Sequence, residues 1–295
     1  MRSEKILAPD GFALAADIFD VAEPKIILQL IHGASEYKDR YWDFMGWLQE
    51  RGVASVITDT RGHGASLGGE YVQGFMNGTE ELIRDQLAVT EYIRSLYPNA
   101  ELALFGHSFG SLLARIYMQK QDQLLSKVVL CGTVNYDPRV GFGLAVGRFF
   151  TKLSGPHGRS RVVALLNKVG GSDLEWLSAN RENIRRYEAD PKCGFKYENQ
   201  GTMTIFEADK QLHDFEDFLC QNPALPILSI SGSDDPITGG SKGLQDSFQS
   251  LAKVGYQKIK SLVYPGMRHE VLNEVERERV YEDVFEFLLA SSTEN

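Results

Sequence analysis

Short apolar runs alternate with segments of helical periodicity along most of this chain. The run Ile26–Ile31 is nearly all apolar apart from Gln29, as is typical of a strand that is covered on both faces. Further on, Leu82, Val89, Ile93 and Leu96 recur at near-helical spacing until Pro98. Strands that alternate with helices predict βαβ units, and therefore a mainly parallel central sheet flanked by helices.

The same pattern predicts the remaining elements. Strands are expected at 53–57, 102–105, 127–131, 226–231 and 259–264, and helices near 42–48, 244–254 and 271–289. The turn signal Ala8-Pro9-Asp10-Gly11 separates two short runs within residues 5–21, which indicates a hairpin at the start of the chain.

Residues 138–210 interrupt this alternation. They contain no convincing buried strand, and their short helical pieces are separated by glycine and proline. They carry 12 Lys and Arg against 8 Asp and Glu, whereas the whole chain has a net charge of −9. We therefore expect an α/β core of residues 1–137 and 211–295 with a helical cap inserted at 138–210. The alternative is a helical subdomain that serves stability alone.

Composition narrows the class of protein. A chain of 295 residues with this negative charge has no general basic face for nucleic acid. It shows no apolar run of about 18 residues, as a membrane span requires, and no signal-peptide pattern. Its cysteines (Cys131, Cys193, Cys220) are odd in number and match no metal-site spacing. We expect reduced thiols, a cytoplasmic location and, at most, peripheral membrane contact through the cap; the sequence leaves the oligomeric state undetermined.

The chemistry centres on Gly106-His107-Ser108-Phe109-Gly110, which joins the apolar run 102–105 to an Ala- and Leu-rich helical segment. A Gly-x-Ser-x-Gly motif in a strand–turn–helix context is typical of a nucleophilic serine on a tight turn. The two glycines allow the strand and the helix to approach closely. A glycine-flanked turn serine without a catalytic role is the alternative.

A serine nucleophile needs a histidine base and a carboxylate that orients the histidine. In this arrangement the three follow in the chain order Ser, acid, His. His269 follows the last predicted strand, and Asp234 and Asp235 follow the strand before it. We favour Asp235, which stands next to Pro236, while Asp234 and, one strand earlier, Asp137 remain alternatives.

The oxyanion of the reaction needs backbone donors. One is expected at Phe109, directly after the serine, and the other at Ala34 in the turn His32-Gly33-Ala34. The other histidines (His32, His63, His107, His157, His213) are expected in structural or surface roles. No histidine pair has metal-ligand spacing and no glycine loop is of the dinucleotide type, so we expect no cofactor and no metal.

With these motifs, the chain resembles the α/β-hydrolases of the monoacylglycerol lipase and lysophospholipase branch, also labelled serine aminopeptidase-like. The resembling segments are 32–36, 59–66, 106–110, 232–235 and 266–270 in the core, and 176–180 and 187–194 in the insertion. The resemblance implies hydrolysis of carboxylic esters with Ser108, Asp235 and His269 as triad, Ala34 and Phe109 as oxyanion donors, and a cap that forms an acyl-chain tunnel. The chain departs from the family at Phe109-Gly110-Ser111, where Met-Gly-Gly is commoner, and at Ser35, where many members have glycine.

We therefore expect a serine hydrolase acting on a lipid or small-molecule ester such as a monoacylglycerol or a lysophospholipid. Leu144, Val146, Phe149 and Phe150 are candidates for an acyl-chain site or for simple core packing. The alternatives are an amide or peptide hydrolase, an esterase of short-chain esters, an acyltransferase, and a binding module that keeps the fold without the activity.

Overall fold

A single sheet organises the computed structural model, which describes residues 1–166 and 174–290. Its strands within these residues are β1 (Arg2–Leu7), β2 (Ala13–Phe19), β3 (Ile26–Ile31), β4 (Ala54–Thr58), β5 (Glu101–His107), β6 (Lys127–Cys131), β7 (Pro226–Gly232) and β8 (Lys258–Tyr264). They lie in the order β1-β2-β4-β3-β5-β6-β7-β8. The pairs β1–β2 and β2–β4 are antiparallel, and all other pairs are parallel. The predicted α/β class with a mainly parallel sheet is confirmed.

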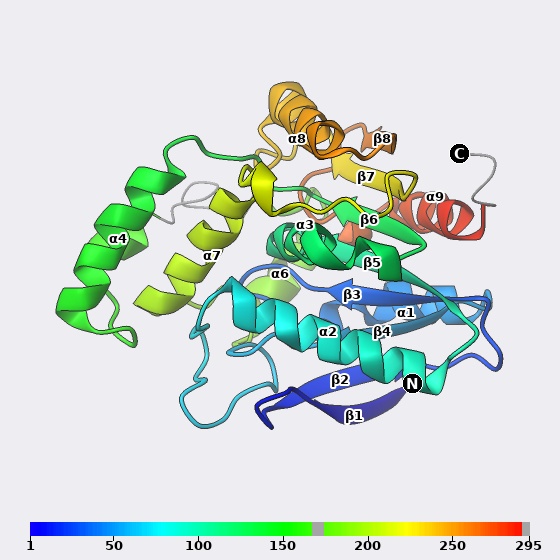
Figure 1. Ribbon diagram of the computed structural model, residues 1–295, viewed down its shortest axis with the longest axis horizontal. Coiled ribbons are helices and arrows are strands. Elements are labelled where there is room, and N and C mark those ends of the chain that lie inside the picture. Colours follow the sequence, from blue (N-terminus) through cyan, green and yellow to red (C-terminus); the bar gives the residue numbers. More distant parts are fainter. Residues whose placement is uncertain (167–173, 291–295) are drawn as a thin grey trace.

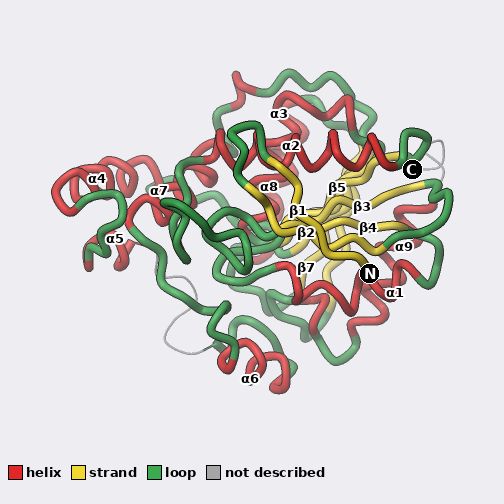
Figure 2. Tube along the Cα trace, turned by 90° about the horizontal axis from the view of Figure 1, so that it is seen from below, coloured by secondary structure: helices red, strands yellow, loops and turns green. Residues whose placement is uncertain are grey.

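Helices cover both faces of this sheet, as Figures 1 and 2 show. The helices α2 (Thr79–Leu96), α3 (Phe109–Gln121) and α8 (Gly240–Val254) pack on one face, and α1 (Trp42–Gln49) and α9 (Arg277–Leu289) pack on the other. Because both faces are covered, the central strands are apolar on both sides, and every residue of β3, β4, β6 and β7 is buried.

The insertion between β6 and β7 forms the helices α4 (Val140–Ser154), α5 (Arg161–Leu166), α6 (Arg181–Ala189) and α7 (Asn199–Gln211). In Figure 1, α4 and α7 project to one side of the sheet, beyond the carboxyl ends of the parallel strands. Leu144, Val163 and Met203 form a small core of their own between α4, α5 and α7, against which Phe150 packs. Phe149, in contrast, is 60% exposed. Leu144 and Phe150 thus serve packing within the insertion.

The predicted last helix needs a correction at its start. The segment expected as one helix at 271–289 begins with a 3-10 turn, Val271–Asn273, and α9 starts only at Arg277. The side chains of Val271 and Leu272 are buried in the core, and Glu274 adopts an extended backbone. The carboxylate of Glu274 accepts hydrogen bonds from the N–H groups of Arg268, Ala179 and Asn180. These contacts hold Glu274 in place between the loop of His269 and the segment before α6.

Two further properties bear on the environment of the protein. No helix in the described ranges combines the length and the apolar character that crossing a membrane requires. Cys131, Cys193 and Cys220 are unpaired thiols.

Candidate active site

Ser108 lies on a sharp turn between β5 and α3. Its backbone has a φ of 51° and a ψ of −119°, a conformation that is strained for any residue with a side chain. The glycines on either side are sterically required. A Cβ on Gly106 would lie 2.2 Å from the carbonyl oxygen of Gly110, and a Cβ on Gly110 would lie 2.1 Å from that of Ile31. The turn therefore packs α3 directly against β3 and leaves the Ser108 side chain only half-buried.

His269 and Asp235 meet at the carboxyl ends of the neighbouring strands. Nδ1 of His269 lies 2.9 Å from Oδ2 of Asp235, and both side chains are almost completely buried. Since a carboxylate can only accept, Nδ1 carries the proton and Nε2 is left free to act as a base. The second carboxylate oxygen accepts the N–H of Ile237 at 2.8 Å, which fixes the orientation of Asp235.

The pKa of His269 reflects this pairing. Burial favours the neutral imidazole, but the charge of Asp235 and its hydrogen bond outweigh burial, so the pKa lies above the ordinary histidine value. An imidazolium at this position is therefore stabilised, as a general base requires once it has accepted a proton.

The two competing carboxylates lie elsewhere. Asp234 is exposed and accepts a hydrogen bond from the Ser233 hydroxyl at 2.7 Å. Asp137 pairs on the surface with Arg139 at 2.9 Å. Of the three candidate acids, the structure brings Asp235 into contact with His269.

Two glycines show how closely the turns of this edge approach one another. A Cβ on Gly132, at the end of β6, would lie 3.0 Å from Cε1 and Nδ1 of His269. A Cβ on Gly33, after β3, would lie 3.2 Å from Cβ of Ser108. The turn after β3 thus lies beside the nucleophile candidate, and the end of β6 lies beside the base candidate.

The two expected oxyanion donors are placed differently along the backbone. Phe109 is the first residue of α3, where helix geometry leaves the N–H without an intrahelical acceptor. Ala34 lies in the turn after β3, and the preceding N–H of Gly33 donates to the carboxylate of Glu36 at 2.5 Å. This bond closes the turn within itself.

The other histidines make structural contacts. Nε2 of His32 accepts the N–H of Thr60 at 2.9 Å, so that His32 links two turns at the strand ends. His107 is buried beneath the site, with its ring 4.8 Å from that of His269, and burial lowers its pKa to about 4. His157 pairs with Glu198, and His213 pairs with Asp246.

A buried group of charges beside the site was not assigned a role from the sequence. The Arg40 guanidinium lies between the carboxylates of Glu36 and Glu270, donating to both, and it also donates to the Asn183 side chain at 3.1 Å. Glu270 is the neighbour of His269 and accepts from Asn183 at 2.7 Å. The group therefore connects the turn of Ala34, the loop of His269 and helix α6 of the insertion.

The two carboxylates of this group differ in their titration. Burial opposes the ionisation of both, but His107 and Arg40 outweigh burial at Glu36 and hold its pKa below the ordinary value. At Glu270 burial prevails over Arg40, and the pKa is raised. Both residues stand within motifs of the family resemblance, which was the only sequence signal for them.

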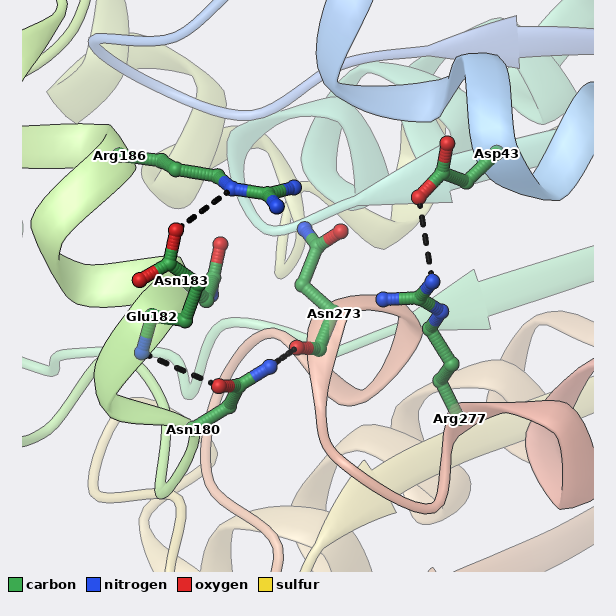
Figure 3. Close-up of a pocket in the computed structure, with 7 residues that line it drawn as sticks. All are labelled: Asp43, Asn180, Glu182, Asn183, Arg186, Asn273 and Arg277. Atoms are coloured by element: carbon green, nitrogen blue, oxygen red, sulfur yellow. Dashed lines mark hydrogen bonds and ion pairs between the residues drawn. The ribbon is translucent and has the colours of Figure 1, made fainter.

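The insertion contacts the core through a polar seam, which Figure 3 shows around a pocket of about 100 Å³. Nδ2 of Asn180 in the insertion donates to the carbonyl of Asn273 in the core at 2.9 Å. On the core side of the pocket, Arg277 of α9 pairs with Asp43 of α1 at 3.2 Å. Nearby, the Trp176 ring lies 5.3 Å from the ring of His269. The start of α6 and the segment before it are thus fastened to the loop that carries the candidate base.

Across 1–166 and 174–290, no three His, Cys, Asp or Glu side chains gather in a way that could hold a metal ion. The groups that converge at this edge instead suit nucleophilic attack, proton transfer and binding of an oxyanion.

Known proteins resemble the chain over nearly its whole length. It is 26% identical to a monoacylglycerol lipase of Mycolicibacterium smegmatis over 98% of both chains, and 25% identical to mouse monoglyceride lipase over 85% of this chain and 81% of the mouse protein. Its fold matches that of a thermostable carboxyl esterase from Bacillus coagulans with a TM-score of 0.85 at 22% identity, over 97% of both chains. A model of the family described as "Serine aminopeptidase, S33" matches residues 22–276. The chain therefore belongs to this serine aminopeptidase family and has the α/β-hydrolase fold.

Proposed function

We propose that the protein is a serine hydrolase that cleaves carboxylic esters through an acyl-enzyme, with monoacylglycerols or lysophospholipids as its substrates. Two observations support this proposal: the buried His269–Asp235 pair, and the half-buried Ser108 on a strained elbow. Relatives named as monoacylglycerol lipases support the substrate class.

In this mechanism Oγ of Ser108 attacks the ester carbonyl carbon while Nε2 of His269 takes its proton. The carbonyl oxygen becomes an oxyanion, which the N–H groups of Ala34 and Phe109 bind. His269 then gives the proton to the leaving alcohol as the carbon–oxygen bond breaks. A water molecule, deprotonated by His269, attacks the acyl-enzyme. The bond between the acyl carbon and Oγ of Ser108 then breaks, His269 returns the proton to Oγ, and the carboxylic acid leaves. Asp235 holds the imidazole and stabilises its charge throughout.

A lipid substrate also fits the outer surface of α4. Phe142, Phe149 and Leu153 are 73%, 60% and 68% exposed, and they recur at helical spacing. The exposed cations Arg148 and Lys152 lie on the same helix. An apolar stripe with neighbouring cations suits peripheral contact with a lipid surface. We propose this contact for the cap of residues 138–210, and a cytoplasmic location for a protein with three unpaired thiols.

The test is the initial rate on p-nitrophenyl esters from acetyl to palmitoyl, with Ser108→Ala as control and a fluorophosphonate probe for the nucleophile. We expect the rate to peak at medium or long acyl chains and to vanish, together with labelling, in the variant. Activity confined to acetyl and butyryl esters would refute the lipid substrate but keep the esterase. Faster cleavage of aminoacyl anilides would favour the amide hydrolase instead.

A further inference from the structure

Ser35, next to the expected oxyanion donor Ala34, is held in an unusual backbone conformation. Its φ is 53°, in the left-handed region that favours glycine. A serine stays in this region only where the surrounding contacts compensate for the steric cost. The contacts of Ser35 therefore determine the conformation of this turn.

Residues 187–197 of the insertion supply these contacts. The N–H of Ser35 donates to the Tyr197 hydroxyl at 2.7 Å. Its carbonyl accepts from the N–H of Gly194 at 2.9 Å and from the Tyr187 hydroxyl at 3.0 Å. Its own hydroxyl donates to the carbonyl of Phe195 at 3.2 Å. All the hydrogen-bonding groups of Ser35 are thus engaged by one segment of the insertion.

The Tyr197 hydroxyl has a defined direction. Nδ1 of His63 lies 3.0 Å from the carbonyl of Arg61, which can only accept, so Nδ1 carries the proton and Nε2 is an acceptor. Nε2 lies 2.7 Å from the Tyr197 hydroxyl, which must therefore donate to it. This leaves the lone pairs of the hydroxyl oxygen for the N–H of Ser35.

His63 keeps this role at neutral pH. Burial, assisted by the nearby His32, lowers its pKa to about 3. The Tyr197 phenol likewise stays protonated, because burial raises its pKa. The chain of hydrogen bonds from Ser35 through Tyr197 to His63 is thus neutral, and its polarity does not reverse.

We propose that Tyr197 and Ser35 form a positioning relay by which the insertion fixes the peptide of Ala34 for oxyanion binding. The Tyr197 hydroxyl bonds to Ser35 and His63, and in this relay it acts by holding Ser35 at positive φ. The Ala34 N–H belongs to the peptide that joins Gly33 to Ala34. The peptide after it is fixed by the bond from Ser35 to Tyr197, and the peptide before it by the bond from Gly33 to Glu36. This inference rests on the proposed function.

The test is Tyr197→Phe in two backgrounds, wild type and Ser35→Gly, with a soluble short-chain p-nitrophenyl ester. Displacement of catalytic groups by about 1 Å can cost about a hundred-fold, and we expect a loss in kcat on the order of ten-fold with KM nearly constant. Glycine adopts positive φ without steric cost, so the same substitution should cost much less in the Ser35→Gly background. A purely structural role of Tyr197 would not produce this rescue.

The matched control is Tyr256→Phe, which removes another buried tyrosine hydroxyl, 3.1 Å from Asp122 and remote from the site. It should lower the melting temperature and leave kcat as in the wild type. If Tyr197→Phe gives no folded protein, Ser35→Ala and Ser35→Gly replace it. Both lose the serine hydroxyl, and alanine, which is strained at this φ, should lose more kcat than glycine.

Unchanged kcat in Tyr197→Phe, or an equal loss in both backgrounds, would overturn the relay while wild-type activity upholds the proposed function. Equal kcat in Ser35→Ala and Ser35→Gly would also overturn it. A wild-type protein that neither hydrolyses esters nor reacts with a fluorophosphonate would overturn both.

Discussion

Gly132 offers a direct test of whether the placement of His269 governs activity. It follows β6 with a φ of 54°, and its Cα faces the imidazole of His269. In Gly132→Ala the added Cβ would lie 3.0 Å from Cε1 and Nδ1 of that ring, whereas ordinary contacts begin at 3.4 Å. The substitution therefore adds a single methyl group that presses on the candidate base.

The imidazole cannot absorb this contact without moving within its site. Its other sides face the ring of Trp176 at 5.3 Å, the ring of His107 at 4.8 Å and the carboxylate of Asp235 at 2.9 Å. The ring must shift by a few tenths of an ångström. Scaled from about a hundred-fold per ångström, this predicts a loss in kcat of about three- to ten-fold. Positive φ at an alanine costs a further 1 to 2 kcal/mol, roughly, in the free energy of unfolding.

Gly52→Ala separates these two effects. Gly52 has a φ of 83°, and a Cβ there would meet nothing within 4 Å. Both variants should lower the melting temperature by several degrees, at about 2 to 4 °C per kcal/mol. Only Gly132→Ala should lose kcat on a short-chain p-nitrophenyl ester. If both variants keep full kcat, or both lose it equally, the reasoning from the contact with His269 is wrong.

Three further predictions concern the acid, the base and the insertion. Asp235→Asn should lower kcat by about 10³- to 10⁴-fold, because the imidazole loses its orienting carboxylate. Substitution of the exposed neighbour, Asp234→Asn, should change kcat by less than about two-fold. Equal effects of the two substitutions would contradict the assignment of Asp235. Because the pKa of His269 is raised, its charged pair with the carboxylate should stabilise the fold below about pH 6.5, and this contribution should fade as pH rises through the folded-state pKa. Hydrolysis needs the neutral imidazole, so kcat/KM should rise as pH rises through the pKa of His269. A kcat/KM that does not depend on pH would exclude His269 as the base. The double substitution Phe149→Ser and Leu153→Ser should slow hydrolysis of vesicle-bound monoacylglycerol several-fold. It should leave the rate on soluble esters and the melting temperature unchanged, since both side chains are exposed. An equal loss of rate on both substrates would argue against surface docking.

Periodicity predicted the core strands well. These strands are buried on both faces, so most of their residues are apolar and the run is easy to identify in the sequence. The run Lys127–Cys131 became β6 with the same bounds, and the hairpin around Pro9-Asp10 formed as expected. The predicted start of α9 was wrong. Val271 and Leu272 are apolar because they are buried in the core, and they do not belong to the apolar face of a helix. A local pattern does not distinguish these two reasons for an apolar residue.

The site divides in a similar way. The order of motifs in the chain singled out Ser108, Asp235 and His269, and the structure brings the last two into contact. The role of Arg40 could not be inferred, because its partners Glu270 and Asn183 are 230 and 143 residues away in the chain. No local pattern records a pairing of that range. The pairing with Glu270 forms when the ends of the core strands meet, and the pairing with Asn183 forms when the insertion packs on the core.

The seam between α6 and the core determines which parts of the insertion can be exchanged between related proteins. Within 174–198 the insertion bonds to Glu270 through the carbonyl of Leu177, and to Ser35 through Gly194 and Tyr197. The helix α4 comes before this segment and presents Phe142, Phe149 and Leu153 to solvent. Exchanging α4 for that of a relative can therefore change the apolar stripe for which we propose lipid contact, while the bonds between residues 174–198 and the core stay in place. An exchange that includes α6 must also include the core turns that bond to it. The insertion therefore consists of two parts that can be exchanged separately, although it is one stretch of sequence.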